Sequence, residues 1–452
     1  MDGEQLPQPL SSLLKSAAEE VSRHPRVSVL SHYDADGLSA ASILCATLLR
    51  AGKRVHVVTT KALDDEMIRG VGEGAECLIL SDMGSSSLPQ LESLHASVIV
   101  LDHHAPLGDS TKLFHVNPHL FGIDGMTSAC AGSMSMLFSL TVDEKNWDLL
   151  PVAFAGMVGD RQHIRGLKGV NKYLLDGGVS RGMLQVRPGS LVPPGRLLEG
   201  LMDCIDPYLI GITGDAEGAK ALLTEAKLPL DATLESLNDN QRRMLSSLVA
   251  LRLIKQGCTS SAMDELITDR YFFPSWNAYA DDLAQLLNAC GRTDKEGLGI
   301  ALALRDKHAA EAAELLRKQY KDAIIAGMKA VIDNGVTRME NIQWFESTNT
   351  SLSGVLAGTI MQFIGDCDKP TLTIAVHHQS VRVSSRASFR ILEKGVDLSV
   401  ALREAAKSVG GTGGGHAVAS GATIPLGKEQ EFLARVDSIV GEQKAKKAAA
   451  KA

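Results

Sequence analysis

Acidic and histidine residues recur at the ends of apolar, β-branched runs in the first half of the chain. The segments SHYDADG (31–37), SDMGSS (81–86) and LDHHAP (101–106) follow or close such runs, and GMVGDRQH (156–163) closes an apolar helical pattern. Neighbouring parallel strands end at one edge of a sheet, so these groups are expected to converge in space. The carboxylates among them belong to Asp34, Asp36, Asp82, Asp102 and Asp160. They would repel one another and stay ionised only beside cations. The pattern therefore predicts a site for divalent metal ions.

The number and type of donor groups indicate two ions rather than one. The candidate ligands are His32, Asp34, Asp36, Asp82, His103, His104 and Asp160. They are more than a single tetrahedral or octahedral ion requires, and their mixture of imidazole and carboxylate favours Mn²⁺ over Mg²⁺. Two ions about 3.5–4 Å apart, bridged by one carboxylate, suit in-line attack on phosphorus. The predicted chemistry is hydrolysis of a phosphodiester or a phosphoanhydride.

A single aspartate in such a position has a plainer explanation. Asp34 or Asp82, just past a strand, would cap a following helix. Capping accounts for one or two of the aspartates, but not for four such motifs that include a pair of histidines. We therefore prefer the metal site.

The elements around these motifs predict an α/β fold. Residues 1–190 alternate β-rich runs with helical patterns, which is typical of a parallel sheet with crossover helices. Strands are expected at 26–31, 55–60, 77–82, 97–102 and 113–117. Residues 200–340 show almost only helical periodicity, and a mixed pattern with strands at 371–377 and 381–386 follows. The expected order is an N-terminal parallel-sheet domain, a helical insert and a smaller mixed α/β domain.

We place the domain boundaries where these patterns change. The predicted parts are residues 1–195, 196–344 and 345–440, followed by a basic tail at 441–452. The formal charge of the chain is −7, yet residues from 351 onward hold 13 Lys and Arg against 9 Asp and Glu. The C-terminal part is therefore the better candidate for contact with a polyanion.

Composition excludes several classes of protein. No run is apolar and charge-free over a membrane-spanning length, and the first ten residues lack the order of a signal peptide. The 7 cysteines show no CxxC spacing, so neither a disulfide framework nor a thiolate zinc site is indicated. We expect a cytoplasmic protein without membrane contact. The 19 aromatic residues are too few for a long base-stacking channel.

At this point the motifs resemble a known family. DHH (102–104), joined to HxDxDG, a strand-end Asp and a later GD, resembles the DHH phosphoesterase superfamily. The C-terminal GGTGGGHAVASGATIP is similar to the DHH-associated substrate-binding domain of that superfamily. DPYLIGITG (206–214) and NACGR (288–292) resemble segments of archaeal RecJ-like, single-strand-specific exonucleases. The resemblance implies an archaeal source.

The resemblance also implies a role for each side chain of the site. His32 and Asp34 would bind the first ion. Asp36, His103 and Asp160 would bind the second, and Asp82 would bridge both. His104 would contact the scissile phosphate, stabilising charge in the transition state or helping the leaving oxygen. Asp102 would accept an imidazole N–H and so free the other ring nitrogen for the metal.

Two segments of the C-terminal domain are candidates for substrate binding. In VRVSSRAS the period of two puts Arg382, Ser384 and Arg386 on one strand face, where they could donate hydrogen bonds to phosphate oxygens. The glycine-rich turn lets backbone N–H groups approach a terminal phosphate; its residues are Gly413, Gly414, Gly415 and His416. The alternatives are a solvated strand face for the arginines and a helix C-cap with a turn for the glycines.

Other clusters are better explained as structure. His377 and His378 end a strand with no carboxylate nearby in the sequence. The aromatic run YFFPSW with Tyr279 could stack bases, but core packing is the preferred interpretation.

These observations lead to one hypothesis with two rivals. We predict a two-metal exonuclease that trims single-stranded nucleic acid, DNA favoured, from an end, with the strand between the two domains. Its partners would be that strand and replication or repair proteins. One rival is a nanoRNase-like phosphodiesterase for dinucleotides or short oligonucleotides. The other is a scaffold subunit of a replication complex, although every expected ligand is present.

Overall fold

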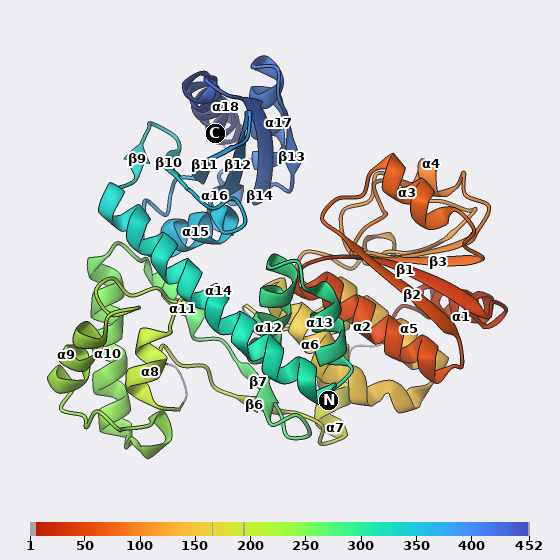
Figure 1. The fold of residues 1–452 in the computed structure, drawn as a ribbon, viewed down its shortest axis with the longest axis horizontal. Coiled ribbons are helices and arrows are strands. Elements are labelled where there is room, and N and C mark those ends of the chain that lie inside the picture. Colours follow the sequence, from red (N-terminus) through yellow and green to blue (C-terminus); the bar gives the residue numbers. More distant parts are fainter. Residues whose placement is uncertain (1–5, 165, 193–194, 451–452) are drawn as a thin grey trace. The chain divides into compact units, whose positions relative to one another are not determined.

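The computed structural model describes residues 6–164, 166–192 and 195–450 of the 452-residue chain (Figure 1). The chain divides into two compact units, neither of them continuous in sequence. Unit 1 comprises Met1–Gly189 and Thr268–Tyr320, and unit 2 comprises Ser190–Ile267 and Lys321–Ala452. Among the described residues, no helix has both the length and the apolar character needed to cross a bilayer.

Unit 1 is built on the parallel sheet that the sequence predicts. Its strands lie in the order β2-β1-β3-β4-β5, and every neighbouring pair is parallel. Their bounds are β1 Arg26–His32, β2 Arg54–Thr60, β3 Cys77–Ser81, β4 Ser97–Leu101 and β5 Phe114–Val116. Ser31 pairs with Ser81, and Ser81 with Leu101. The residues that follow this row therefore leave the sheet side by side.

Helices cover both faces of this sheet, because alternate strand residues enter different cores. Val29, Ile79 and Ile99 pack with residues of α1, α2, α5 and α6, whereas neighbours such as Leu80 and Val100 pack with residues of α3 and α4 (Figure 1). The helices are α1 Gln8–Ser22, α2 Ala35–Arg50, α3 Asp65–Gly72, α4 Leu88–Leu91, α5 Ala131–Val142, α6 Leu150–Gly159 and α7 Gly169–Ser180. The short 3₁₀ turns are η1 Pro118–Phe121 and η2 Glu144–Leu149. The predicted layered α/β fold is confirmed.

A later segment completes unit 1. It contributes β7 Arg270–Phe273, β8 Ala278–Tyr279, α12 Ala280–Arg292, α13 Glu296–Ala303 and the first part of α14 Lys307–Asn334. β7 pairs with β8 and with β6 Gln185–Arg187. The expectation of almost purely helical structure at 200–340 missed β7 and β8, because these strands are too short for a period of two to show. The predicted core role of the aromatic run is confirmed for two side chains: Tyr271 and Phe273 are buried and contact the Phe154 ring edge-on.

Unit 2 begins with helices and ends with a mixed sheet. The helical elements are α8 Leu197–Met202, α9 Ala216–Glu225, η3 Leu234–Ser236, α10 Asp239–Lys255 and α11 Ser260–Leu266. The six-stranded sheet has the order β13-β14-β12-β11-β10-β9. Its strands are β9 Thr337–Arg338, β10 Gln343–Glu346, β11 Thr371–His377, β12 Ser380–Arg386, β13 Thr412–Gly415 and β14 Ala419–Pro425. The predicted mixed C-terminal fold is confirmed.

Helices lie on both faces of the second sheet. α17 Leu398–Ser408 and α18 Glu429–Ala449 share an apolar core with Ile374, Val383 and Ile424 (Figure 1). α15 Ser353–Thr359 contacts β11 and β12, η4 Ile360–Ile364 is a π-helical turn, and α16 Phe389–Glu393 follows β12. α18 takes in most of the predicted basic tail, of which residues 451–452 lie outside the described range. The predicted domain boundaries stay predictions.

Candidate metal centre

Three of the predicted motifs leave the sheet of unit 1 at the same edge. His32 is the last residue of β1, Asp82 follows β3, and Asp102 with the two histidines follows β4. Asp82 has a φ of 60°, the left-handed conformation that non-glycine residues adopt at a cost in energy. A strained backbone at a buried carboxylate is a frequent property of functional sites.

Helix ends bring two further carboxylates to this edge. Asp36 lies in the first turn of α2, and its carboxylate accepts the backbone N–H groups of Ala131 (2.7 Å) and Gly132 (2.8 Å) at the start of α5. Asp160 follows the last residue of α6. A Cβ atom at Gly156 would lie 2.4 Å from Asp36 Oδ1. Glycine at position 156 is therefore what lets α6 come so close to Asp36.

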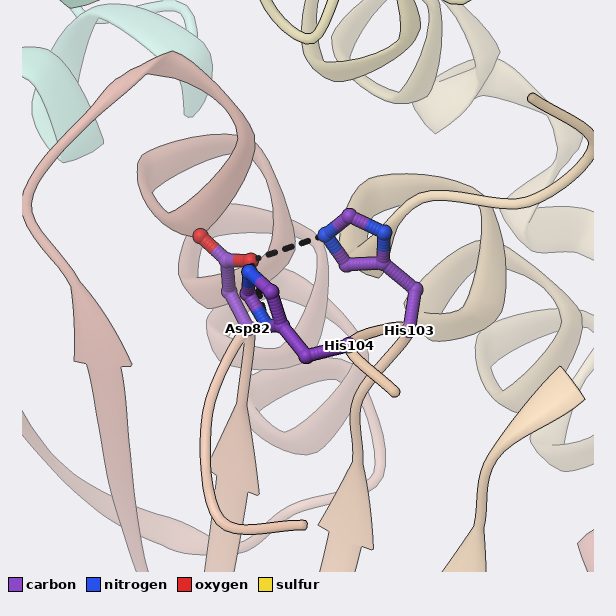
Figure 2. Close-up of side chains that lie close together, drawn as sticks. All are labelled: Asp82, His103 and His104. Atoms are coloured by element: carbon purple, nitrogen blue, oxygen red, sulfur yellow. Dashed lines mark hydrogen bonds and ion pairs between the residues drawn. The ribbon is translucent and has the colours of Figure 1, made fainter. Parts of the chain in front are cut away.

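The candidate ligands form three overlapping groups, in each of which the donor atoms lie within 4.8 Å of one another. The groups are His32, Asp34 and Asp82; Asp36, His103 and Asp160; and Asp82, His103 and His104. Asp82 and His103 each belong to two of them, and Figure 2 shows these side chains with His104. The first two groups coincide with the sets predicted for the two ions. Their role as ligands stays a prediction.

Single distances show how closely the groups converge. His103 Nε2 lies 3.2 Å from Asp82 Oδ1, 3.3 Å from Asp160 Oδ2 and 3.7 Å from Asp36 Oδ2. On the other side of Asp82, His32 Nδ1 lies 3.4 Å from Asp82 Oδ2 and 3.1 Å from Asp34 Oδ2. The two oxygens of Asp82 thus face different histidines, which is the arrangement expected of a bridging carboxylate.

The carboxylates of the cluster repel one another. Burial and the charge of Asp82 raise the pKa of Asp36 to about 6. Burial and Asp36 raise the pKa of Asp160 well above its usual range. Both groups therefore resist ionisation in the protein alone. A divalent cation would relieve this repulsion, so the donor set fits such ions.

The imidazoles show the complementary effect. Burial lowers the pKa of His32, but Asp34 and Asp82 outweigh burial and raise that pKa to about 11. The pKa of His103 is also raised well above its usual value, because Asp82 and other carboxylates outweigh burial. The surroundings of both rings thus favour a positive charge at this edge of the sheet.

Asp102 is joined to the cluster through His104, a member of its third group. His104 Nδ1 lies 2.7 Å from Asp102 Oδ1, and Asp102 Oδ2 accepts the backbone N–H of Ser85 at 3.0 Å. Asp102 is 1% exposed, whereas the His104 side chain is 30% exposed. Asp102 thus lies where it can accept an imidazole N–H, and the ring that it orients is His104; the predicted role of Asp102 stays a prediction.

The NACGR segment contacts the loop that holds His32 and Asp34, a proximity that no signal in the sequence indicated. Asn288 Oδ1 accepts the backbone N–H of Ala35 at 3.2 Å, and Arg292 Nη1 donates to the Tyr33 hydroxyl at 2.6 Å. A Cβ atom at Gly291 would lie 1.8 Å from the Tyr33 carbonyl oxygen. α12 thus supports the backbone on both sides of Asp34.

The predicted substrate-binding arginines lie in unit 2, on β12. Val381, Val383 and Ser385 of that strand are buried, so Arg382, Ser384 and Arg386 share the opposite face, as predicted. That face is not simply solvated. Arg386 Nη1 donates to the carbonyl of Ser385 at 2.8 Å, and a Cβ atom at Gly354 of α15 would lie 2.5 Å from Arg386 Nη2.

The glycine-rich segment differs from the prediction in its local structure. Gly410, with a φ of 80°, follows the end of α17, but Gly413, Gly414 and Gly415 form edge strand β13 rather than a turn. Small residues permit this strand to pair closely with β14. His416 follows β13, and its backbone N–H donates to the carbonyl of Ala419 at 2.8 Å. Phosphate binding by these residues stays a prediction.

His377 and His378 lie where β11 turns into β12, with ring centroids 4.4 Å apart in an edge-on arrangement. His378 has a φ of 55°, as turn residues often do. This position agrees with the structural interpretation of the pair.

Comparisons with known proteins agree with this architecture. A model of the DHH family, N-terminal domain, matches residues 26–158, and a model of the DHHA1 domain matches residues 348–442. An uncharacterized protein of Methanocaldococcus jannaschii is 28% identical over 445 residues, covering 96% of this chain and 98% of the relative.

Solved structures share the fold at low sequence identity. CDC45 from Entamoeba histolytica superimposes with a TM-score of 0.64 at 10% identity, covering 96% of this chain and 98% of that chain. RecJ from Thermus thermophilus, solved in complex with Mn²⁺, gives a TM-score of 0.61 at 18% identity. The match covers 97% of this chain but 56% of the Thermus chain, so this chain spans little more than half the length of that protein.

Proposed function

This chain, with its DHH family N-terminal domain and its DHHA1 domain, is a member of the DHH phosphoesterase superfamily, and we propose that it is a metal-dependent exonuclease. Its substrate would be single-stranded nucleic acid, with DNA preferred over RNA, shortened from one end. The observation that carries the proposal is the convergence of seven acidic and imidazole side chains, in three overlapping groups, at one edge of a parallel sheet.

Two divalent cations fit the donor set. His32 and Asp34 would hold one ion, Asp36, His103 and Asp160 the other, and Asp82 would bridge them. When bound, the ions would supply positive charge to stabilise the phosphate in the transition state and would make an attacking water more acidic. The mixed nitrogen and oxygen donors support Mn²⁺, and the Thermus RecJ was solved with Mn²⁺ and with Mg²⁺.

The remaining side chains would act on the substrate directly. Since Asp102 holds His104 through Nδ1, His104 Nε2 would interact with the scissile phosphate or pass a proton to the leaving oxygen. In unit 2, Arg382, Ser384 and Arg386 with the glycines of β13 would hold a terminal phosphate.

The comparisons support this cellular setting to different degrees. The RecJ likeness supports an exonuclease, and the relative from Methanocaldococcus jannaschii supports an archaeal source. The CDC45 likeness supports a place among replication or repair proteins. A purely structural role is less well supported, because every predicted ligand is present in the cluster.

A time course on labelled oligonucleotides tests the proposal. Purified protein is incubated with DNA and RNA strands of 2 to about 40 nucleotides, labelled at either end, with Mn²⁺, Mg²⁺ or EDTA. We expect long strands to be shortened stepwise with Mn²⁺ or Mg²⁺ and to stay intact with EDTA. His104→Ala should slow this cleavage without changing the affinity for the metal ion. Cleavage confined to dinucleotides would favour the short-substrate rival. No cleavage of any strand with either ion would overturn the exonuclease.

A further inference from the structure

Behind His103, a buried chain of hydrogen bonds leads away from the metal cluster. His103 Nδ1 lies 2.7 Å from the carbonyl oxygen of Gly125. The same oxygen accepts a hydrogen bond from Gln162 Nε2 at 2.9 Å, and that nitrogen also donates to the carbonyl of Ala129 at 3.0 Å. Gln162 Oε1 in turn accepts from Asn171 Nδ2 at 2.7 Å. Gln162 and Asn171 are 4% and 0% exposed.

The bond to Gly125 determines which nitrogen of His103 is available. A carbonyl oxygen only accepts, so Nδ1 must carry a proton, and the lone pair of the neutral ring lies on Nε2. Nε2 is the nitrogen that points at Asp82, Asp160 and Asp36. The position of the Gly125 carbonyl therefore decides whether His103 can act as a ligand.

Gly125 lies in a loop, where no helix or strand holds its carbonyl. The segment runs between η1 and α5, and a Cβ atom at Gly125 would lie 1.9 Å from the carbonyl oxygen of His103. Gln162 ties this loop at two points, Gly125 and Ala129, to the turn after α6. The amide of Gln162 thus gives the Gly125 carbonyl a hydrogen-bond donor that is anchored outside the loop.

Asn171 sets the orientation of that amide. If the Gln162 amide were turned over, Oε1 would face two carbonyl oxygens and the Gln162 nitrogen would face the Asn171 amino group. Only the observed orientation gives each group a partner of the opposite kind. Asn171 Oδ1 has no hydrogen-bond partner among the described residues, so Asn171 contributes here as a donor.

We propose that Gln162 and Asn171 are positioning residues that hold the Gly125 carbonyl against His103 and so keep Nε2 available for a divalent cation. The inference rests on the proposed metal-dependent function. It goes beyond it because both amides reach the cluster through the Gly125 carbonyl rather than as ligands. Loss of such an outer partner typically weakens metal affinity about 10- to 100-fold.

Mn²⁺ titration of the chelator-treated, full-length protein tests the inference without any substrate. Gln162→Met keeps the size of the side chain and removes both N–H donors, so Mn²⁺ affinity should fall at least about tenfold. Asn171→Asp is isosteric but can only accept, so it should turn the Gln162 amide over and lower the affinity as well. In the Gln162→Met background, Asn171→Asp should cause no further loss, since the amide it acts through is gone.

Gln343→Met is the matched control. Gln343 is also fully buried, donates to the carbonyl of Asp366 at 2.9 Å and to Thr371 Oγ1 at 2.8 Å, and lies in unit 2. This control should lose stability but not Mn²⁺ affinity. Unchanged Mn²⁺ affinity in folded Gln162→Met, or additive losses in the double variant, would overturn the positioning role alone. A wild-type protein that binds no Mn²⁺ would overturn the proposed function, and this inference with it.

Discussion

The repulsion within the acidic cluster predicts how Asp36→Asn changes stability with pH in metal-free protein. Burial and the charge of Asp82 raise the pKa of Asp36 from 3.8 to about 6. The folded state therefore holds the proton on Asp36 more tightly than the unfolded state does. The stability associated with this proton is fully present below pH 3.8 and is lost as the pH rises through about 6. At neutral pH, the ionised Asp36 destabilises the metal-free fold.

The size of the effect follows from the two pKa values. A difference of about two units corresponds to about 3 kcal/mol once both states are ionised, and about half of this is already lost at pH 5. Asparagine carries no such charge at any pH. It offers one acceptor oxygen to the N–H groups of Ala131 and Gly132 where the carboxylate offers two, which offsets part of the gain above the pKa. Relative to wild type, Asp36→Asn should thus gain stability between pH 5 and pH 8, on the order of 1 to 2 kcal/mol.

Urea unfolding in EDTA at the two pH values measures this difference. Tryptophan fluorescence reports on unit 1 through Trp147 and Trp276 and on unit 2 through Trp344. Asp437→Asn serves as the control, because Asp437 also accepts two backbone N–H groups but lies in unit 2, outside the cluster. The difference in unfolding free energy between Asp36→Asn and wild type should rise from pH 5 to pH 8. A difference that stays constant or falls would refute the reasoning. Added Mn²⁺ at 100 times its Kd should stabilise wild type by about 2.7 kcal/mol and this variant far less.

Three further outcomes are expected. Asp82→Ala removes the carboxylate shared by two groups of the cluster and should abolish cleavage of labelled single strands. Circular dichroism should show that the fold of this variant is unchanged. Gly413→Ala would place Cβ 2.7 Å from the carbonyl of Leu402 and should lower the melting temperature, whereas Gly414→Ala meets open space and should not. Asn288→Leu leaves the N–H of Ala35 without its acceptor and should reduce kcat at least about tenfold, while unfolding costs about 1–3 kcal/mol less than in wild type and the protein stays folded at the assay temperature. Normal turnover by this last variant would show that the loop holds its shape without α12.

The arrangement of the strand ends was predictable from the sequence because two local signals coincide there. Buried parallel strands appear as short apolar runs, and the polar residues after each run must lie at the carboxyl edge. The register then aligns Ser31, Ser81 and Leu101, so residues 32, 82 and 102 follow one row. A shift of one residue in any strand would turn its side chains to the other face. Both faces of β3 and β4 are apolar, so the apolar run locates these strands, whereas their register follows only from the folded sheet.

The local structure of the glycines was less predictable, because glycine fits both a turn and a close strand pairing. Gly414 pairs with Gly421 of β14, and Gly421 with Ser384 of β12. This pairing is decided by residues on other strands, which no local pattern reveals. The same holds for Gln162 and Asn171: two buried amides nine positions apart give no signal until their partners are known.

The support from α12 shows which force places a distant segment at the site. The hydrogen bond between Ala35 and Asn288 joins residues 253 positions apart and contributes about 1 kcal/mol. Leu283 and Leu287 of α12 are buried with Leu38 of α2 in one apolar cluster, and each such side chain contributes about 1.5–3 kcal/mol. Apolar packing therefore holds α12 against α2, and the hydrogen bond sets its register. Many apolar surfaces could cover Leu38, so the sequence does not indicate which one does. Only the folded chain reveals that α12, which lies outside the matched DHH segment at residues 26–158, supports the backbone of that segment.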